Sequence, residues 1–162
     1  MARVPAWSTV SDDVHSPRTL YLVKQLESAI RAIMDDGLRS FGLTTLQYTA
    51  LSVLRQRDDL SSAQLARRAF VRPQTMHQMV QSLHERELIE RRRDPDNRRV
   101  LLIRLSASGR ALLDECEPLV RDIEERMLAG MPSHERTAFR HALAQGCDEL
   151  SDIARDGWPQ QE

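Results

Sequence analysis

The sequence predicts a mainly α-helical fold with one small β-hairpin. Three observations predict it: apolar residues recur at steps of three and four in several stretches, helix-capping residues precede those stretches, and two β-suited runs flank a charged turn. The chain has 162 residues, a length that suits one hydrophobic core. We therefore expect a single domain over residues 1–162.

The first expected helix covers about residues 16–37. Ser16 and Pro17 form a typical helix opening, with serine as the N-cap and proline at the first helical position. Apolar residues then follow at helical spacing. Gly37 is expected to close this helix in the left-handed conformation.

Two short helices are expected next, each opened by the same device. Thr44 with Gln47, and Ser61 with Gln64, both fit a capping box, in which each residue satisfies a backbone N–H of the other. Two such boxes close together indicate short, tightly connected helices. This spacing is typical of the segment that precedes a helix-turn-helix.

A further helix is expected from Arg72 to Arg86, opened by a proline. At 100° per residue, its methionine, valine and leucine side chains cluster on one side, and Gln74, Gln78 and Gln81 lie almost opposite. An uncharged face rich in hydrogen-bonding groups suits the major groove, where glutamine pairs with adenine. Taken alone, the helix also fits an ordinary solvated face.

The two β-suited runs are Leu88 to Arg92 and Val100 to Leu105, and they predict a hairpin. Its loop carries Arg93, Arg98 and Arg99 around a turn-forming Asp-Pro pair. Arginines that project beside a groove-reading helix can bind phosphate or enter the minor groove. The hairpin thus favours DNA binding over the alternative of a solubilising surface loop.

Two long helices are expected over residues 106–156. Pro118 predicts a bend in the first of them, and a break at Gly130 to Ser133 separates it from the second, which should end by Gly157. Their apolar stripes, and that of residues 16–37, have too little apolar material opposite them within one subunit. We therefore predict a homodimer in which these end helices form the dimerisation region.

The distribution of charge supports a nucleic-acid partner although the net charge is only −1. Between Arg67 and Arg104 there are ten arginines and five acidic residues, a local balance of +5. This balance argues against the alternative that the helix and hairpin bind only protein. An aromatic content of 4% is low for a single-strand binder that stacks bases, so double-stranded DNA is the expected partner.

Other classes of function lack their sequence signals. The five histidines show no metal spacing, and there is no phosphate-binding glycine loop or nucleophile motif, so we expect no enzyme, cofactor or metal. The two cysteines, Cys116 and Cys147, are expected to be free, buried thiols. No membrane-length apolar run or signal peptide is evident, which predicts a cytoplasmic protein.

The stretch from Gly42 to Arg110 resembles the winged helix-turn-helix of the MarR family of bacterial transcriptional regulators, with the winged helix at about residues 43–105. The resemblance implies a dimeric repressor of a pseudo-palindromic operator, with recognition helices in successive major grooves and wings at the flanks. The matching pieces are Leu43-Thr44-Thr45-Leu46-Gln47-Tyr48, Leu60-Ser61-Ser62-Ala63-Gln64-Leu65-Ala66, Pro73 to Ile89, Asp94-Pro95-Asp96-Asn97-Arg98-Arg99 and Leu105-Ser106-x-x-Gly109-Arg110.

The resemblance also implies roles for single residues. The wing arginine corresponds to Arg99, with Arg98 beside it. The recognition helix supplies Arg72, Gln74, Thr75, His77 and Gln78.

This sequence departs from the family pattern at three positions. Asn97 stands where an aspartate commonly orients the wing arginine. Arg72 replaces a small capping residue, and Glu87 replaces a glycine often found between the recognition helix and the wing.

Members of the family are commonly released from DNA by a small anionic or phenolic ligand held between the dimer helices and the winged lobe. Arg18, Tyr21 and Tyr48 are the candidates here, the arginine for an anion and the tyrosines for a ring, although tyrosines at such positions are often plain core residues. The alternative switch is oxidation of Cys116 or Cys147. We rank control by a ligand above it.

Overall fold

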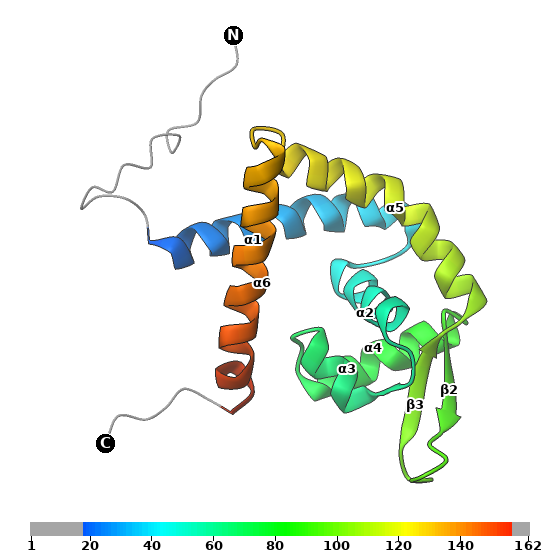
Figure 1. Ribbon diagram of the computed structural model, residues 1–162. Helices are drawn as coiled ribbons and strands as arrows, with labels where there is room; N and C mark the ends of the chain where they lie inside the picture. The colour runs from blue at the N-terminus through cyan, green and yellow to red at the C-terminus, as the bar shows by residue number, and fades with distance from the viewer. Residues whose placement is uncertain (1–17, 157–162) are drawn as a thin grey trace, which may run out of the picture.

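The computed structural model describes residues 18–156, with side chains described as far as Ser151 (Figure 1). It confirms a mainly helical fold with a small β element. None of the helices in this described range is long and apolar enough to cross a membrane. The elements are α1 (Thr19–Gly37), the 3-10 helix η1 (Leu38–Phe41), α2 (Thr45–Gln56), β1 (Leu60–Ser61), α3 (Ser62–Arg68), α4 (Pro73–Glu85), β2 (Ile89–Arg93), β3 (Leu101–Leu105), α5 (Ala107–Met127) and α6 (Ser133–Asp156).

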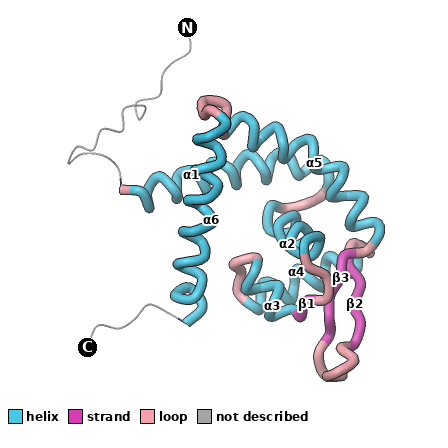
Figure 2. Tube along the Cα trace, in the orientation of Figure 1, coloured by secondary structure: helices cyan, strands magenta, loops and turns pink. Residues whose placement is uncertain are grey.

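The elements from α2 to β3 gather into one winged lobe, and the end helices extend from it (Figure 2). The β element is larger than predicted. β1 joins β3, so the sheet has three antiparallel strands in the order β1-β3-β2, with Leu60 opposite Ile103 and Ile89 opposite Leu105. A strand of two residues is too short to show a sequence period, which is why only a hairpin was expected.

Both predicted capping boxes are present. The hydroxyl of Thr44 accepts from the backbone N–H of Gln47, and the hydroxyl of Ser61 accepts from that of Gln64, each at 3.2 Å. In both boxes the glutamine side-chain oxygen accepts from the backbone N–H of the N-cap residue. These contacts fix where α2 and α3 begin.

The two ends of α1 differ from the expectation. Arg18 is the N-cap, so the helix begins at Thr19, and the predicted opening at Ser16 and Pro17 lies outside the described residues. Gly37 keeps right-handed helical angles and η1 continues the chain; Gly42 is the left-handed residue, with φ 65°. A Cβ on Gly37 would lie 2.8 Å from Leu119, so this glycine allows α1 and α5 to approach closely.

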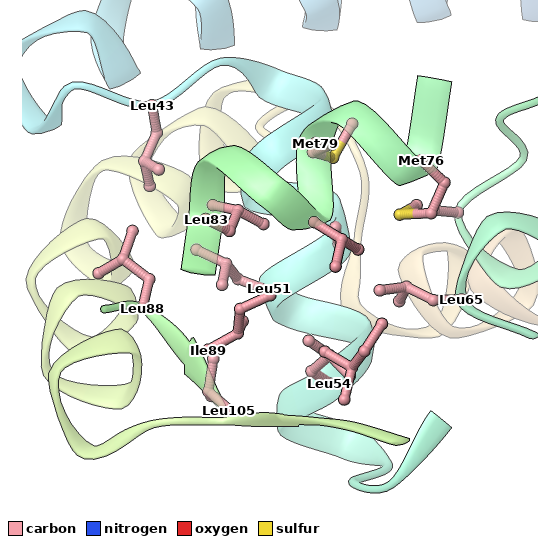
Figure 3. Packing of buried hydrophobic residues seen from close by; sticks show 14 of the residues in the cluster. Leu43, Leu51, Leu54, Leu65, Met76, Met79, Leu83, Leu88, Ile89 and Leu105 are labelled. Atoms are coloured by element: carbon pink, nitrogen blue, oxygen red, sulfur yellow. The ribbon is translucent and has the colours of Figure 1, made fainter. Parts of the chain in front are cut away.

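The core of the lobe lies between α4, α2 and the sheet. The predicted apolar face of α4 is confirmed, since Met76, Met79, Val80 and Leu83 are all buried. Figure 3 shows Met76, Met79 and Leu83 in the cluster that includes side chains of α2 and the strands. Burying one such side chain stabilises the fold by about 1.5 to 3 kcal/mol, so this face holds α4 firmly against the lobe.

The start of α5 is locked against the sheet. Ser106 caps the helix by accepting from the backbone N–H of Gly109 at 3.0 Å. A Cβ on Gly109 would lie 2.1 Å from the carbonyl oxygen of Leu88, so only glycine fits there. Pro118 lies inside α5, and the helix changes direction along its length, as the predicted bend requires (Figure 1).

The apolar stripes of the end helices remain largely uncovered in the protomer. Every side chain from Arg140 to Leu150 on α6 is exposed, including Leu143. On α1, Leu20 and Ile33 are exposed as well. The break between α5 and α6 and the end of α6 before Gly157 are as expected.

Replacing Gly109 with alanine should destabilise the protein by about 2 kcal/mol or more, because the added Cβ overlaps a backbone carbonyl that cannot move alone. The measurement is the free energy of unfolding in urea at one protomer concentration. Gly130→Ala is the matched control, since a Cβ there meets nothing within 4 Å and should change the free energy by less than about 0.5 kcal/mol. Equal stability of the two variants would contradict the close approach.

Candidate nucleic-acid interface

The outer face of α4 presents the residues predicted for base contact. Gln74, Thr75, His77 and Gln78 are all exposed, opposite the buried methionines and leucine. Because the core fixes the rotation of the helix, these four side chains share one face. Amide, hydroxyl and imidazole groups on one helix face can hydrogen-bond to base edges.

The first turn of α4 leaves its backbone N–H groups available. Pro73 is the first residue, and the N-cap Arg72 makes no side-chain capping hydrogen bond, as its position in the sequence predicted. The uncapped N–H groups and the guanidinium of Arg72 both favour an anion at this end.

The last turns of α4 make two side-chain contacts, one to the wing and one within the helix. Nδ1 of His84 lies 3.2 Å from the carbonyl oxygen of Ile89, and Gln81 donates to Glu85 at 3.1 Å. Both histidines of α4 are exposed, but His77 lies on the outer face whereas His84 contacts the first residue of β2. The contact face is concentrated in the first half of the helix.

The wing loop is held by its own backbone. Asp94 donates to the carbonyl of Val100 at 3.0 Å, and Val100 donates to that of Asn97 at 2.8 Å. Within the described chain, no carboxylate lies within 4.0 Å of the guanidinium groups of the three exposed arginines here, which are therefore open to phosphate. These arginines are Arg93, Arg98 and Arg99.

Asn97 orients the backbone of the wing arginine. Its side-chain oxygen accepts from the backbone N–H of Arg99 at 3.2 Å. Asp96 is not a substitute partner for the Arg99 guanidinium among the described residues; its own N–H donates to the Asp94 side chain at 3.0 Å. The departure from the family pattern thus keeps the turn and leaves the guanidinium unpaired.

An ion pair that sequence reasoning missed fixes the base of the wing. Arg92 of β2 donates twice to the carboxylate of Asp59, at 2.8 and 2.7 Å. These hydrogen bonds lower the pKa of Asp59 below its ordinary value and raise that of Arg92. Asp59 adopts a left-handed φ of 61° directly before β1, and an acidic residue in a short turn beside an arginine-rich strand was the available signal.

A second missed contact ties the end of α4 to the start of α2. Arg86 donates to the carbonyl oxygen of Gly42 at 2.8 Å. The next residue, Glu87, has φ 58°, so it adopts the conformation for which the family commonly uses glycine. The turn into the wing therefore keeps its geometry, with some backbone strain.

The residues predicted for an effector are not brought together within one protomer. Arg18 and Tyr21 are exposed at the first turn of α1, whereas Tyr48 is half-buried on α2 and packs on the core. The hydroxyl of Tyr21 accepts from Gln25 of the same helix at 3.1 Å. Figure 1 shows the start of α1 far from α2.

The expectation that both cysteines are buried is wrong for Cys147. Cys116 has no exposed surface, and burial raises the pKa of its thiol, with a smaller contribution from Glu115. Cys147 is exposed, as is every side chain from Arg140 to Leu150, because the rest of the described chain does not cover this part of α6. Within the part of the chain that the structure describes, no three metal-binding side chains are grouped to hold an ion.

Comparisons with known proteins agree with this geometry. The model of the MarR family matches residues 41–100. The HTH-type transcriptional repressor Rv2887 of Mycobacterium tuberculosis is 32% identical over 123 residues, which cover 76% of this chain and 88% of that protein. The HTH-type transcriptional repressor NicR of Pseudomonas putida is 34% identical over 106 residues, covering 65% and 67% of the two chains.

Solved structures are similar in fold over most of the chain. The complex of Rv2887 with salicylic acid has a TM-score of 0.67 at 30% identity, and the match covers 82% of this chain and 98% of that one. BpsR of Bordetella bronchiseptica, whose DNA binding is described as regulated by 6-hydroxynicotinic acid, has a TM-score of 0.73 at 25% identity, with 85% and 99% covered.

The ion pair at the base of the wing should give a pH-dependent contribution to stability. Because folding lowers the pKa of Asp59, the contribution is fully present above the unfolded-state pKa of about 4 and is lost as the pH falls through the lower folded-state pKa. Asp59→Asn removes the charge but tolerates the left-handed φ. Both groups are partly exposed, so the loss at pH 7 should be below about 1 kcal/mol.

The measurement is the difference in free energy of unfolding between the wild type and Asp59→Asn from pH 7 to pH 2. The difference should be constant at neutral pH and shrink toward zero in acid. A difference that stays constant throughout would show that the ionised carboxylate contributes nothing.

Proposed function

The chain belongs to the MarR family of transcriptional regulators, and from this premise we propose that it is a homodimeric repressor that binds double-stranded DNA at a pseudo-palindromic operator. One observation carries the proposal: the uncharged polar face of α4 lies beside a wing on which Arg93, Arg98 and Arg99 are exposed and have no acidic partner in the described chain. A surface with both features suits base edges and phosphates together. The partner implies action in the cytoplasm, where bacterial DNA lies.

The two parts of this surface divide the work. The side chains of α4, among them Gln74, Thr75, His77 and Gln78, choose the sequence through hydrogen bonds to bases. Arg72 at the helix start, and Arg93, Arg98 and Arg99 on the wing, supply affinity through phosphate or minor-groove contacts.

The second protomer is needed to cover the end helices. The exposed leucines and isoleucine of α1 and α6 form apolar stripes of the kind that pack in an isologous interface. In such a dimer the two α4 helices are about one helical turn of DNA apart, roughly 34 Å. A protein-interaction module without DNA binding does not account for the unpaired wing arginines, and we propose no enzymatic role.

We further propose that a small aromatic acid releases the protein from DNA. Rv2887 has been crystallised with salicylic acid, and BpsR is described as regulated by 6-hydroxynicotinic acid. Arg18, Tyr21 and Tyr48 are the proposed ligand residues, and they require the dimer to meet. Redox control ranks lower because burial raises the pKa of the Cys116 thiol, which disfavours the reactive thiolate.

Selection of bound DNA from a random pool tests the proposal. It should enrich a palindrome whose half-sites are about one helical turn apart. Small aromatic acids, salicylate among them, should then weaken binding to the enriched DNA. Failure to enrich any palindrome contradicts the proposed function.

Arg99→Ala should weaken binding to operator and unrelated DNA alike, because a phosphate contact carries no sequence information. The slope of log Kd against log salt concentration should become less steep by about 0.9, the value for one phosphate contact. Arg39→Ala, which removes the same charge at η1, is the control and should leave the slope unchanged. An unchanged slope for Arg99→Ala removes that residue from the contact surface.

Gln78→Ala, and separately Gln74→Ala, should cost about 1 to 3 kcal/mol of binding free energy at one base pair of the half-site. The measurement is a Kd for each single-base variant of the enriched operator. Gln56→Ala, an exposed glutamine at the end of α2, is the control and should leave the preference intact. Uniform weakening on all operator variants would mean that these glutamines do not read bases.

A further inference from the structure

Phe70, in the connection between α3 and α4, is unusual in two ways. Its φ is 54°, and it is 75% exposed. A bulky side chain is strained in the left-handed region, which glycine enters without cost. An exposed phenylalanine in such a position gains little for the folded protomer, so neither feature is explained by stability.

The backbone around Phe70 requires this conformation. Ala69 donates to the carbonyl of Leu65 at 2.9 Å, and Val71 donates to that of Ala66 at 3.0 Å, which ends α3 and turns the chain toward α4. Ala69 is buried, and Val71 is half-buried against the core. The residue between them is therefore held in the left-handed conformation, and the direction of its side chain is fixed outward.

The surroundings of Phe70 indicate what covers the ring. Arg67 and Arg68 form the exposed last turn of α3, and Arg72 is the exposed N-cap of α4. An apolar ring set among cationic side chains fits a polyanion with apolar edges better than it fits an apolar protein surface. DNA has such edges in its deoxyribose rings and thymine methyl groups.

We propose that Phe70 is a DNA-contact residue that packs its ring on the apolar edge of a deoxyribose or a thymine methyl group. The inference rests on the proposed function. The loop carrying Phe70 lies at one end of α4 and the wing lies at the other (Figure 2). Phe70 thus extends the contact surface at the end of the half-site opposite the wing.

This contact has a signature that separates it from the arginine contacts. The ring carries no charge, so its contribution comes from buried apolar surface and releases no counterions. Removing it should weaken binding without changing the salt dependence. Phe70 should also lower the stability of the folded protein while it strengthens binding to DNA, a combination that a core residue does not show.

Phe70→Asn tests the proposal, because asparagine tolerates the left-handed conformation and keeps the charge unchanged. The Kd for the enriched operator should rise about tenfold, and the slope of log Kd against log salt should stay as in the wild type. At the same protomer concentration, the Tm should be unchanged or raised by about 2 °C. Phe70→Tyr, which keeps the ring, should bind like the wild type.

The two apolar edges of DNA are separated by replacing each thymine of the half-site with deoxyuridine. If the ring contacts a methyl group, one replacement should weaken wild-type binding and leave Phe70→Asn unaffected. If no replacement has this effect, the contact is to deoxyribose.

Wild-type affinity in Phe70→Asn overturns the proposal. So does a lower Tm, or dissociation of the dimer by gel filtration, since either would mean that the ring packs on protein. Failure of the wild-type chain to enrich any DNA overturns the proposed function itself, and with it this inference. The two failures are distinguishable because wild-type binding is measured first.

Discussion

The burial of one face of α4 is the constraint on which the winged lobe depends. Met76 and Leu83 have no exposed surface and lie in one cluster with Leu51 and Leu54 of α2. Neighbouring residues of a helix differ in direction by about 100°, so a small rotation of α4 would expose this face and bury polar side chains. The packing of the core therefore determines which side chains of α4 face outward, and any sequence preference follows from an apolar interaction on the opposite side.

Local patterns predicted the helices well because local chemistry begins and ends them. Pro73 and the spacing of the apolar residues predicted the bounds of α4 to within one residue at each end. Both predicted capping boxes are present. The errors arise where the chain around a residue differs from the expected course. Gly37 is not the left-handed cap because the chain continues from it into η1, and Cys147 is exposed because the rest of the described chain does not cover this part of α6.

The candidate site was predicted less completely than the fold. Periodicity identified the outer face of α4, and turn residues identified the wing, since each signal lies within a few positions of the chain. The pair of Asp59 and Arg92 joins residues 33 positions apart, and Arg86 reaches Gly42 across 44 positions. Residues so far apart in the chain give at most a weak sequence signal for such contacts, although the contacts hold the base of the wing and the end of α4.

Pro118 interrupts the backbone hydrogen bonding of α5. Proline has no backbone N–H to donate to the carbonyl of Asp114, so one hydrogen bond of α5 is missing there. The segment before it is fastened to the winged lobe, with Arg55 of α2 lying 3.5 Å from Asp114 and 3.4 Å from Glu117. The segment after it leads to α6. The missing hydrogen bond makes this the point at which α5 can bend, so Pro118 helps to determine the direction in which α5 leads away from the winged lobe toward α6 (Figure 1).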